Sequence, residues 1–139
     1  MPLKPTLTHI ALHVADFSAC SRFYQDFCGL KVVHQREEYG KTVIWLAEEG
    51  KEKAFILVLI PGGPGRNQAE NDFSHLGFAL ESKQAVDAIA AKAKVQHCLW
   101  WEPTDHPYPV GYYCGVLDPD GNAVEFSYGQ PLGYGARDS

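Results

Sequence analysis

Two histidines and one glutamate stand at positions from which they could bind a common metal ion. His9, His75 and Glu125 each lie within a run of alternating apolar and polar residues. Alternation with a period of two is typical of a half-buried strand, so each side chain should point away from the apolar face of its strand. Imidazole and carboxylate groups bind divalent Fe, Mn, Zn, Ni or Co, and three protein ligands leave positions for water and substrate. The pattern therefore predicts a metal site at His9, His75 and Glu125.

The competing interpretation is that these residues are ordinary solvated side chains on exposed strand faces. Their equivalent placement argues against it, because His9 and His75 occupy the same position in two similar halves of the chain, about 66 residues apart. His9 and His13 also resemble a ligand pair. On a strand, however, their α-carbons would be about 13 Å apart at roughly 3.3 Å per residue, which is too far for one metal. We expect His13 to line a pocket or to lie on the surface.

The elements that would position these residues repeat along the chain. In the first half, strands are expected at residues 7–14, 30–36, 41–47 and 53–60, with a helix that begins after Asp16 or Ser18 and ends at Gly29. A linker rich in Pro and Gly follows at about 62–72. In the second half, strands are expected at 74–80, 95–101, 111–117 and 123–128, with a helix after Ser82 and a Pro-rich loop at 102–109. The sequence thus predicts two βαβββ repeats, at about 6–61 and 73–130, within a single domain spanning 1–139.

Composition narrows the choice of partners and compartment. The chain of 139 residues carries a net charge of −5, and its lysines and arginines are scattered singly. A nucleic-acid-binding surface or an anionic-membrane-binding surface needs clustered basic residues, so neither partner is expected. No apolar run approaches the roughly 20 residues of a membrane span. Because the N-terminal residues resemble no secretory signal, we expect a cytoplasmic protein.

Four segments of the chain form a recognisable set: THIALHVAD at 8–16, FCGLKV at 27–32, SHLGF at 74–78 and LDPDGNAVE at 117–125. Together they resemble the vicinal oxygen chelate superfamily, which includes glyoxalase I, extradiol ring-cleaving dioxygenases, fosfomycin-resistance enzymes and bleomycin-resistance proteins. The resemblance covers the chain from Thr8 to about Gly133. It implies an α+β fold in which the two repeats form a curved mixed sheet around a metal cleft, and it also implies a homodimer. The metal ligands of the superfamily match His9, His75 and Glu125 residue by residue.

Departures from the superfamily pattern leave the activity open. The fourth ligand position falls within residues 54–60, which contain no His, Asp, Glu or Gln, whereas glyoxalase-type enzymes usually carry a carboxylate or amide there. Many ring-cleaving dioxygenases carry a Tyr ten residues before the ligand Glu, where this chain has Gly115; Tyr113 is the nearest candidate for a pocket donor. We expect a divalent-metal enzyme acting on a small vicinal-oxygen substrate, either dioxygenase-like or a glyoxalase-like lyase or isomerase, with Glu125 and Tyr113 catalytic. The alternative is a metal-free small-molecule-binding protein of the bleomycin-resistance type.

Overall fold

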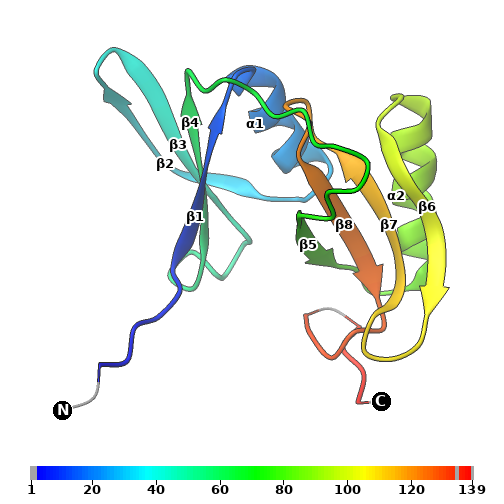
Figure 1. Cartoon of the computed structure of the whole chain (residues 1–139). Helices are drawn as coiled ribbons and strands as arrows, with labels where there is room; N and C mark the ends of the chain where they lie inside the picture. The colour runs from blue at the N-terminus through cyan, green and yellow to red at the C-terminus, as the bar shows by residue number, and fades with distance from the viewer. Residues whose placement is uncertain (1–2, 134, 139) are drawn as a thin grey trace. The chain divides into compact units, whose positions relative to one another are not determined.

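A computed structural model describes residues 3–133 and 135–138, and the chain forms two compact units that meet in sequence between Arg66 and Asn67. Both units have the order strand, helix and three strands (Figure 1). The first unit contains β1 (His9–Val14), α1 (Phe17–Asp26), β2 (Lys31–Glu38), β3 (Lys41–Ala47) and β4 (Ile56–Pro61). The second unit contains β5 (His75–Ala79), α2 (Lys83–Val95), β6 (Leu99–His106), β7 (Gly111–Leu117) and β8 (Ala123–Tyr128).

Each unit builds its own four-stranded mixed sheet. The strand order is β1-β4-β3-β2 in the first sheet and β5-β8-β7-β6 in the second, with β1 parallel to β4 and β5 parallel to β8. The other neighbouring strands are antiparallel. The expected α+β class and the two βαβββ repeats are confirmed, and the boundary between the units falls inside the expected linker. The grouping of both units into a single domain stays a prediction.

The two helices begin where the sequence places capping residues. Asp16 caps α1, because its Oδ1 accepts a hydrogen bond of 3.1 Å from the backbone N–H of Ala19. Ser82 caps α2 in the same way, with 3.0 Å from the N–H of Ala85 to its Oγ. Each cap satisfies a backbone donor that the first helical turn leaves without an intrahelical partner. In the described part of the chain, neither helix is long and apolar enough to cross a membrane.

The sequence-based assignment was wrong at residues 95–98 and 102–106, whereas the strand at 99–101 is confirmed. Val95 ends α2 rather than starting a strand, and the residues expected to form a Pro-rich loop continue β6 as far as His106. Proline is tolerated here because β6 is the edge strand of its sheet, so the missing N–H of Pro103 costs no ladder hydrogen bond. The register with β7 shifts between Trp101 and Thr104, on either side of Pro103. The strand is thus irregular at Pro103 but does not end there.

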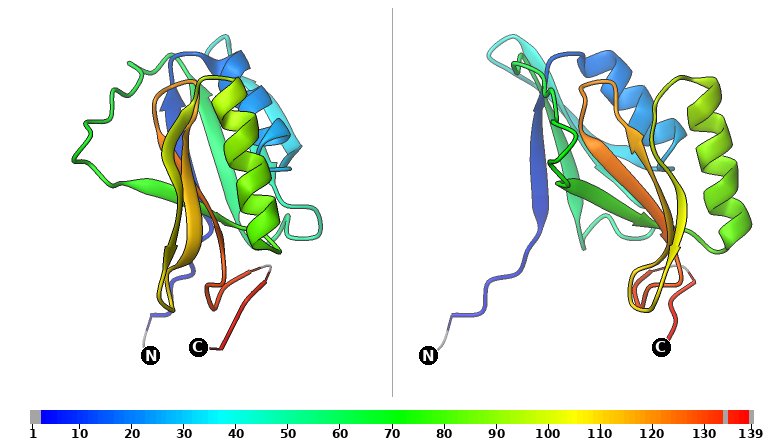
Figure 2. Two further views of the ribbon diagram at one scale, coloured as in Figure 1. Left: turned by 90° about the vertical axis from the view of Figure 1, so that its right-hand side faces the viewer. Right: turned by 45° about the vertical axis from the view of Figure 1, so that its right-hand side comes forward.

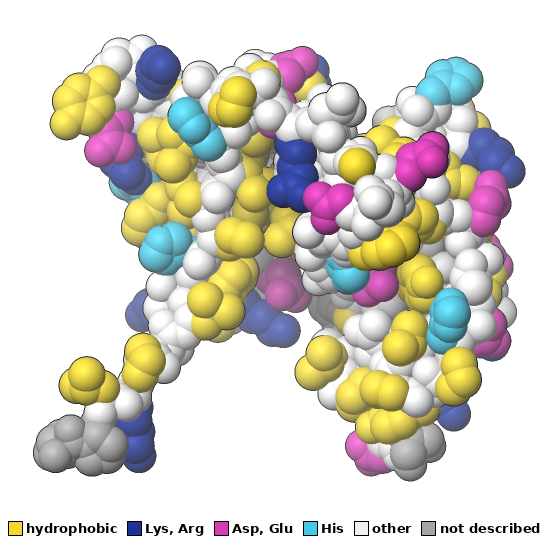
Figure 3. Space-filling view, in the orientation of Figure 1, with side chains coloured by type: hydrophobic (Ala, Val, Ile, Leu, Met, Phe, Trp, Pro, Cys, Tyr) yellow, Lys and Arg dark blue, Asp and Glu magenta, His cyan; other side chains and the backbone are white. Residues whose placement is uncertain are grey.

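Helix α2 packs on one face of the second sheet (Figure 2). Val86, Ala90 and Ala93 on the helix are buried, as are Val124 and Phe126 on β8. Side chains alternate along β8, so Glu125 points to the opposite face of the sheet. On the surface seen in Figure 3, the lysine and arginine side chains of the described residues are spread apart, in line with their scatter along the sequence.

Gln68 fastens the linker to the second sheet. Its Nε2 donates hydrogen bonds to the carbonyls of Asp72 (2.6 Å) and Ser74 (2.7 Å), and its Oε1 accepts one from the N–H of Ala123 (3.1 Å). Ala123 starts β8 and pairs with His75 at the start of β5. The Gln68 side chain therefore connects the segment that leads into β5 with the start of its parallel neighbour β8.

We expect Gln68→Ala to destabilise the protein by about 1–3 kcal/mol, because three backbone groups lose their partner and two of these hydrogen bonds are partly buried. Urea unfolding measures the difference. Gln25→Ala is the matched control: the amide of the exposed Gln25 donates to the carbonyl and the hydroxyl of Ser21 within α1, and its loss should cost less than about 0.5 kcal/mol. Equal effects of the two substitutions would contradict the role given to Gln68.

Candidate metal and substrate site

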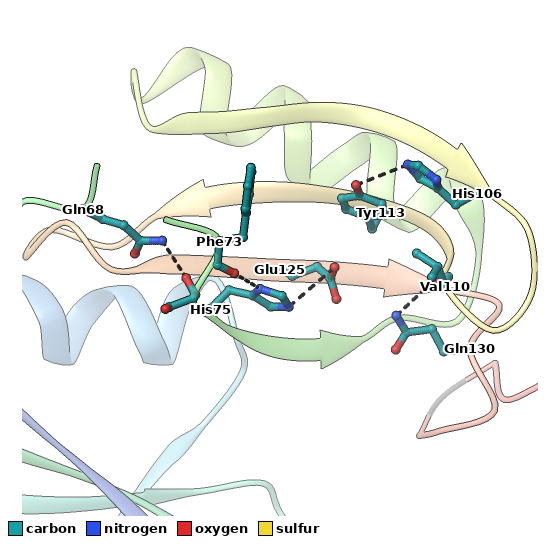
Figure 4. A network of polar contacts seen from close by, with 9 residues as sticks. Gln68, Phe73, His75, His106, Val110, Tyr113, Glu125 and Gln130 are labelled. Carbon is teal, nitrogen blue, oxygen red and sulfur yellow. Dashed lines mark hydrogen bonds and ion pairs between the residues drawn. The ribbon is translucent and has the colours of Figure 1, made fainter. Parts of the chain in front are cut away.

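His75 and Glu125 come together on the face of the second sheet that α2 leaves uncovered. They lie on the neighbouring parallel strands β5 and β8, where His75 pairs with Ala123 and Gly77 pairs with Glu125. Residues two apart on a strand share a face, so this register puts both side chains on the same side. The His75 Nε2 and Glu125 Oε1 atoms are 3.8 Å apart (Figure 4).

The orientation of the His75 ring is fixed by its other nitrogen. Nδ1 lies 2.7 Å from the carbonyl oxygen of Phe73, and since a carbonyl can only accept, Nδ1 carries the proton. In the neutral ring, Nε2 is then left with a lone pair on the side of Glu125. A backbone carbonyl bound to the second ring nitrogen is the usual support of a metal-ligating histidine.

The separation of 3.8 Å suits two ligands of one ion. It is too long for a direct hydrogen bond. With metal–ligand distances of about 2.1 Å, the two atoms would subtend an angle of about 130° at the ion. The donor chemistry of His75 and Glu125 therefore fits a divalent transition metal, and the two atoms are close enough to reach the same ion.

Glu125 is a buried carboxylate with one supporting side chain. It is 9% exposed, and burial raises its pKa, while the proximity of His75 and a hydrogen bond with the Gln130 side chain partly lower it. Gln130 follows β8 directly after Gly129, whose φ of +97° favours glycine. Its Nε2 also donates to the carbonyl oxygen of Val110 at 2.9 Å (Figure 4). Gln130 thus links Glu125 to the turn between β6 and β7.

Glycines flank Glu125 on both neighbouring strands. Gly77 on β5 and Gly115 on β7 are its register partners, and Trp101 on β6 pairs with Gly115. A Cβ on Gly77 would meet, within 4 Å, only Glu125 Oε2, at 3.7 Å. A Cβ on Gly115 would lie 2.3 Å from Cε3 of Trp101, so the indole occupies the volume that a side chain at this position would take.

Tyr113 lies on the same face of the sheet as Glu125, and its side chain contacts His106. Its register partner on β8 is Ser127, two residues beyond Glu125. The Tyr113 hydroxyl is 3.4 Å from Nε2 of His106, and their rings stack with centroids 5.3 Å apart (Figure 4). His106 could not be selected from the sequence, because residues 102–109 were predicted to form a loop. A strand prediction there would have placed its side chain beside Tyr113.

His9 occupies the equivalent position in the first unit. Its Nδ1 lies 2.9 Å from the Thr8 hydroxyl. Ala11 pairs with Val58 as Gly77 pairs with Glu125, so Val58 holds the position of the fourth superfamily ligand. This apolar side chain cannot bind a metal, as expected from the absence of His, Asp, Glu and Gln in residues 54–60.

The structure thus joins two of the three expected ligands, His75 and Glu125, and places His9 in the other unit. Among residues 3–133 and 135–138, no three His, Cys, Asp or Glu side chains are grouped closely enough to hold one metal ion. The sequence did not single out Gln130 as the partner of Glu125, nor Trp101 above the other aromatic residues. No local pattern marks either contact.

Comparison with known proteins identifies the family. Residues 6–126 match the Glyoxalase/Bleomycin resistance protein/Dioxygenase superfamily, and the chain belongs to it. An uncharacterised protein of Pseudomonas aeruginosa is 58% identical over 135 residues, which cover 97% of this chain and 96% of the relative. A lactoylglutathione lyase of Haemophilus influenzae is 27% identical over 127 residues, with 86% and 90% covered.

A solved structure shows the same fold. It is a mutant of the fosfomycin resistance protein FosX from Listeria monocytogenes, complexed with Mn(II) and 1S,2S-dihydroxypropylphosphonic acid. The TM-score is 0.69 at 18% identity, and the match covers 92% of this chain and 95% of FosX. The resemblance to the vicinal oxygen chelate superfamily inferred from the sequence is confirmed by these comparisons.

Proposed function

We propose that this protein is a divalent-metal-dependent enzyme acting on a small molecule that chelates through two vicinal oxygens. His75 and Glu125 supply two ligands and His9 the third. The observation that carries the proposal is the pair of atoms His75 Nε2 and Glu125 Oε1, 3.8 Å apart, with the Nδ1–H of His75 directed to Phe73. We further propose a cytoplasmic homodimer, as the superfamily resemblance implies.

The metal would be Fe(II), Mn, Zn, Ni or Co, all of which accept imidazole and carboxylate ligands. When bound, it would act as a Lewis acid that polarises a substrate oxygen and fixes the orientation of the substrate. Support for metal dependence comes from FosX, which has the same fold and was solved with Mn(II).

The protein's own groups would supply the proton transfers. Burial raises the pKa of Glu125, so its carboxylate is a stronger base than an exposed one and is suited to take a proton from the substrate. The Tyr113 hydroxyl, on the same face, can donate a hydrogen bond to a substrate oxygen, and the stacked His106 ring holds the phenol in place. These roles serve either a lyase or isomerase reaction, as in the lactoylglutathione lyase relative, or a dioxygenase reaction.

Metal analysis tests the proposal directly. Wild-type protein purified in metal-supplemented medium should contain nearly one metal ion per chain, and His9→Ala, His75→Ala and Glu125→Ala should each contain only traces. His97→Ala, which changes a histidine after α2 outside the site, should retain the wild-type content. Equal trace metal in all of these proteins would contradict the proposal and favour the metal-free binding protein.

Two assays then separate the reaction classes. Oxygen consumption with catechols and Fe(II) reports a ring-cleaving dioxygenase, and isomerisation of the methylglyoxal–glutathione adduct with Ni, Zn or Mn reports a glyoxalase-like enzyme. Turnover that disappears in Glu125→Ala assigns the class. A metal-loaded protein inactive in both assays would contradict these two assignments while leaving the metal site standing.

A further inference from the structure

Trp101 lies where its side chain could contact a ligand bound at His75 and Glu125. Its backbone is part of the edge strand β6, and its indole ring lies over Gly115 on β7, which has no side chain. The ring then approaches His75, with centroids 5.8 Å apart and planes at 89°. The indole therefore borders the site on the β7 side, in the volume that a side chain at position 115 would occupy.

The surroundings of the indole are flat and apolar. One face is occupied by Gly115, whose absent side chain leaves room for the ring to lie against the strand. The Phe73 ring is 6.4 Å away at 38°, and it is 68% exposed. Beside Glu125 on β5, Gly77 provides no side chain to fill the adjacent space. A ligand held at His75 and Glu125 would thus meet no side chain from Gly77 on the β5 side and an aromatic wall on the β7 side.

We propose that Trp101, seated on Gly115, is a specificity-determining residue that selects substrates carrying a flat conjugated group next to their chelating oxygens. Aromatic rings favour offset or edge-to-face contact with other π systems, whereas a small aliphatic group gains little there. The inference rests on the proposed metal site and adds the chemical class of the group that lies beside the metal-bound oxygens.

Two chelators with similar oxygen donors test this selectivity. Tropolone presents a carbonyl and a hydroxyl oxygen on a flat aromatic ring, and acetohydroxamate presents comparable oxygens with only a methyl group. Calorimetric titration of the Zn²⁺-loaded protein gives the affinity for each, and metal content measured afterwards shows that Zn²⁺ stays bound. Trp101→Leu should weaken tropolone binding by about 3- to 10-fold and acetohydroxamate binding by less than about 2-fold. Trp101→Phe keeps a flat ring and should retain most of the tropolone affinity.

Gly115→Ala tests the same wall by an independent route. The added Cβ would meet Cε3 of the indole at 2.3 Å, so the ring must leave its place while Trp101 itself is unchanged. Gly115→Ala should therefore reproduce the selectivity of Trp101→Leu, and the double variant should lose no more than either single one, because both remove the same contact.

Each of the following results would overturn the inference. Unchanged tropolone affinity in Trp101→Leu, or an equal loss for both chelators, would show that the indole does not select the ligand. Additive losses in the double variant would show that Gly115 does not act through Trp101. If the wild type binds Zn²⁺ but neither chelator, the inference fails alone; if it binds no Zn²⁺, the proposed function fails and the inference with it.

Discussion

Glu125→Gln is expected to lower divalent-metal affinity by more than about 100-fold and to raise the unfolding temperature of the metal-free protein. Loss of a supporting group of a metal ligand alone typically costs 10- to 100-fold, and a neutral amide replaces the ligand itself here. The gain in stability has a separate cause. Glu125 is a buried acid whose pKa is raised by its burial, so its charge opposes folding at neutral pH, and the amide of similar shape carries no charge.

The pH dependence of stability distinguishes this cause from a change in packing. A carboxyl whose pKa is higher in the folded than in the unfolded protein binds more protons in the folded state. Its contribution to stability is therefore greatest below the ordinary value of about 4.5 and is lost as pH rises through the raised pKa. The advantage of Glu125→Gln over the wild type should accordingly grow with pH above about 4.5 and then level off.

Thermal unfolding in the presence of a chelating agent, measured across this pH range, gives the difference between the two proteins. Glu102→Gln on β6 is the control, because Glu102 is an exposed acid paired with Lys94 at 3.3 Å. Its substitution should leave both the metal affinity and the pH dependence of stability nearly unchanged. A constant difference between Glu125→Gln and wild type at all pH values would contradict the role given to the buried charge.

Gln130→Met is expected to weaken metal binding by about 10- to 100-fold while leaving the fold intact. Methionine has a similar length but no N–H groups, so Glu125 loses its hydrogen bond and the carbonyl of Val110 loses the 2.9 Å bond from Nε2. The carboxylate would then be free to turn away from His75.

Mn²⁺ titration followed by electron paramagnetic resonance measures free and bound metal in each variant. Gln96→Met, at the end of α2, replaces a glutamine outside the site and should bind Mn²⁺ like the wild type. Unfolding temperatures of the metal-free proteins separate a positioning role from a general loss of structure. Wild-type affinity in Gln130→Met would show that Glu125 needs no support from this side chain.

The repeats and the composition of the candidate site could be predicted from the sequence because they depend on local patterns. Alternation of apolar and polar residues assigned His75 and Glu125 to strand faces opposite buried partners such as Val124 and Phe126. Capping residues located both helix starts, and the strands 41–47, 111–117 and 123–128 have the expected bounds. Each of these signals spans only a few residues, so it can be recognised from the order of residue types without knowledge of the tertiary structure.

Other features required the arrangement of strands that are distant in sequence. Pro103 reads as a loop residue until β6 is known to be an edge strand, where a missing N–H is tolerated. The position of Trp101 on Gly115 depends on the register of β6 and β7 and on a vacancy left by glycine.

The sequence by itself determined two repeats, their elements and a set of imidazole and carboxylate candidates. Only the tertiary structure decided that β5 pairs in parallel with β8, which brings His75 within 3.8 Å of Glu125, and that Gln130 supports the carboxylate. The physical reason is that hydrogen-bond register between remote strands sets which side chains meet, and residue order along either strand does not encode that register.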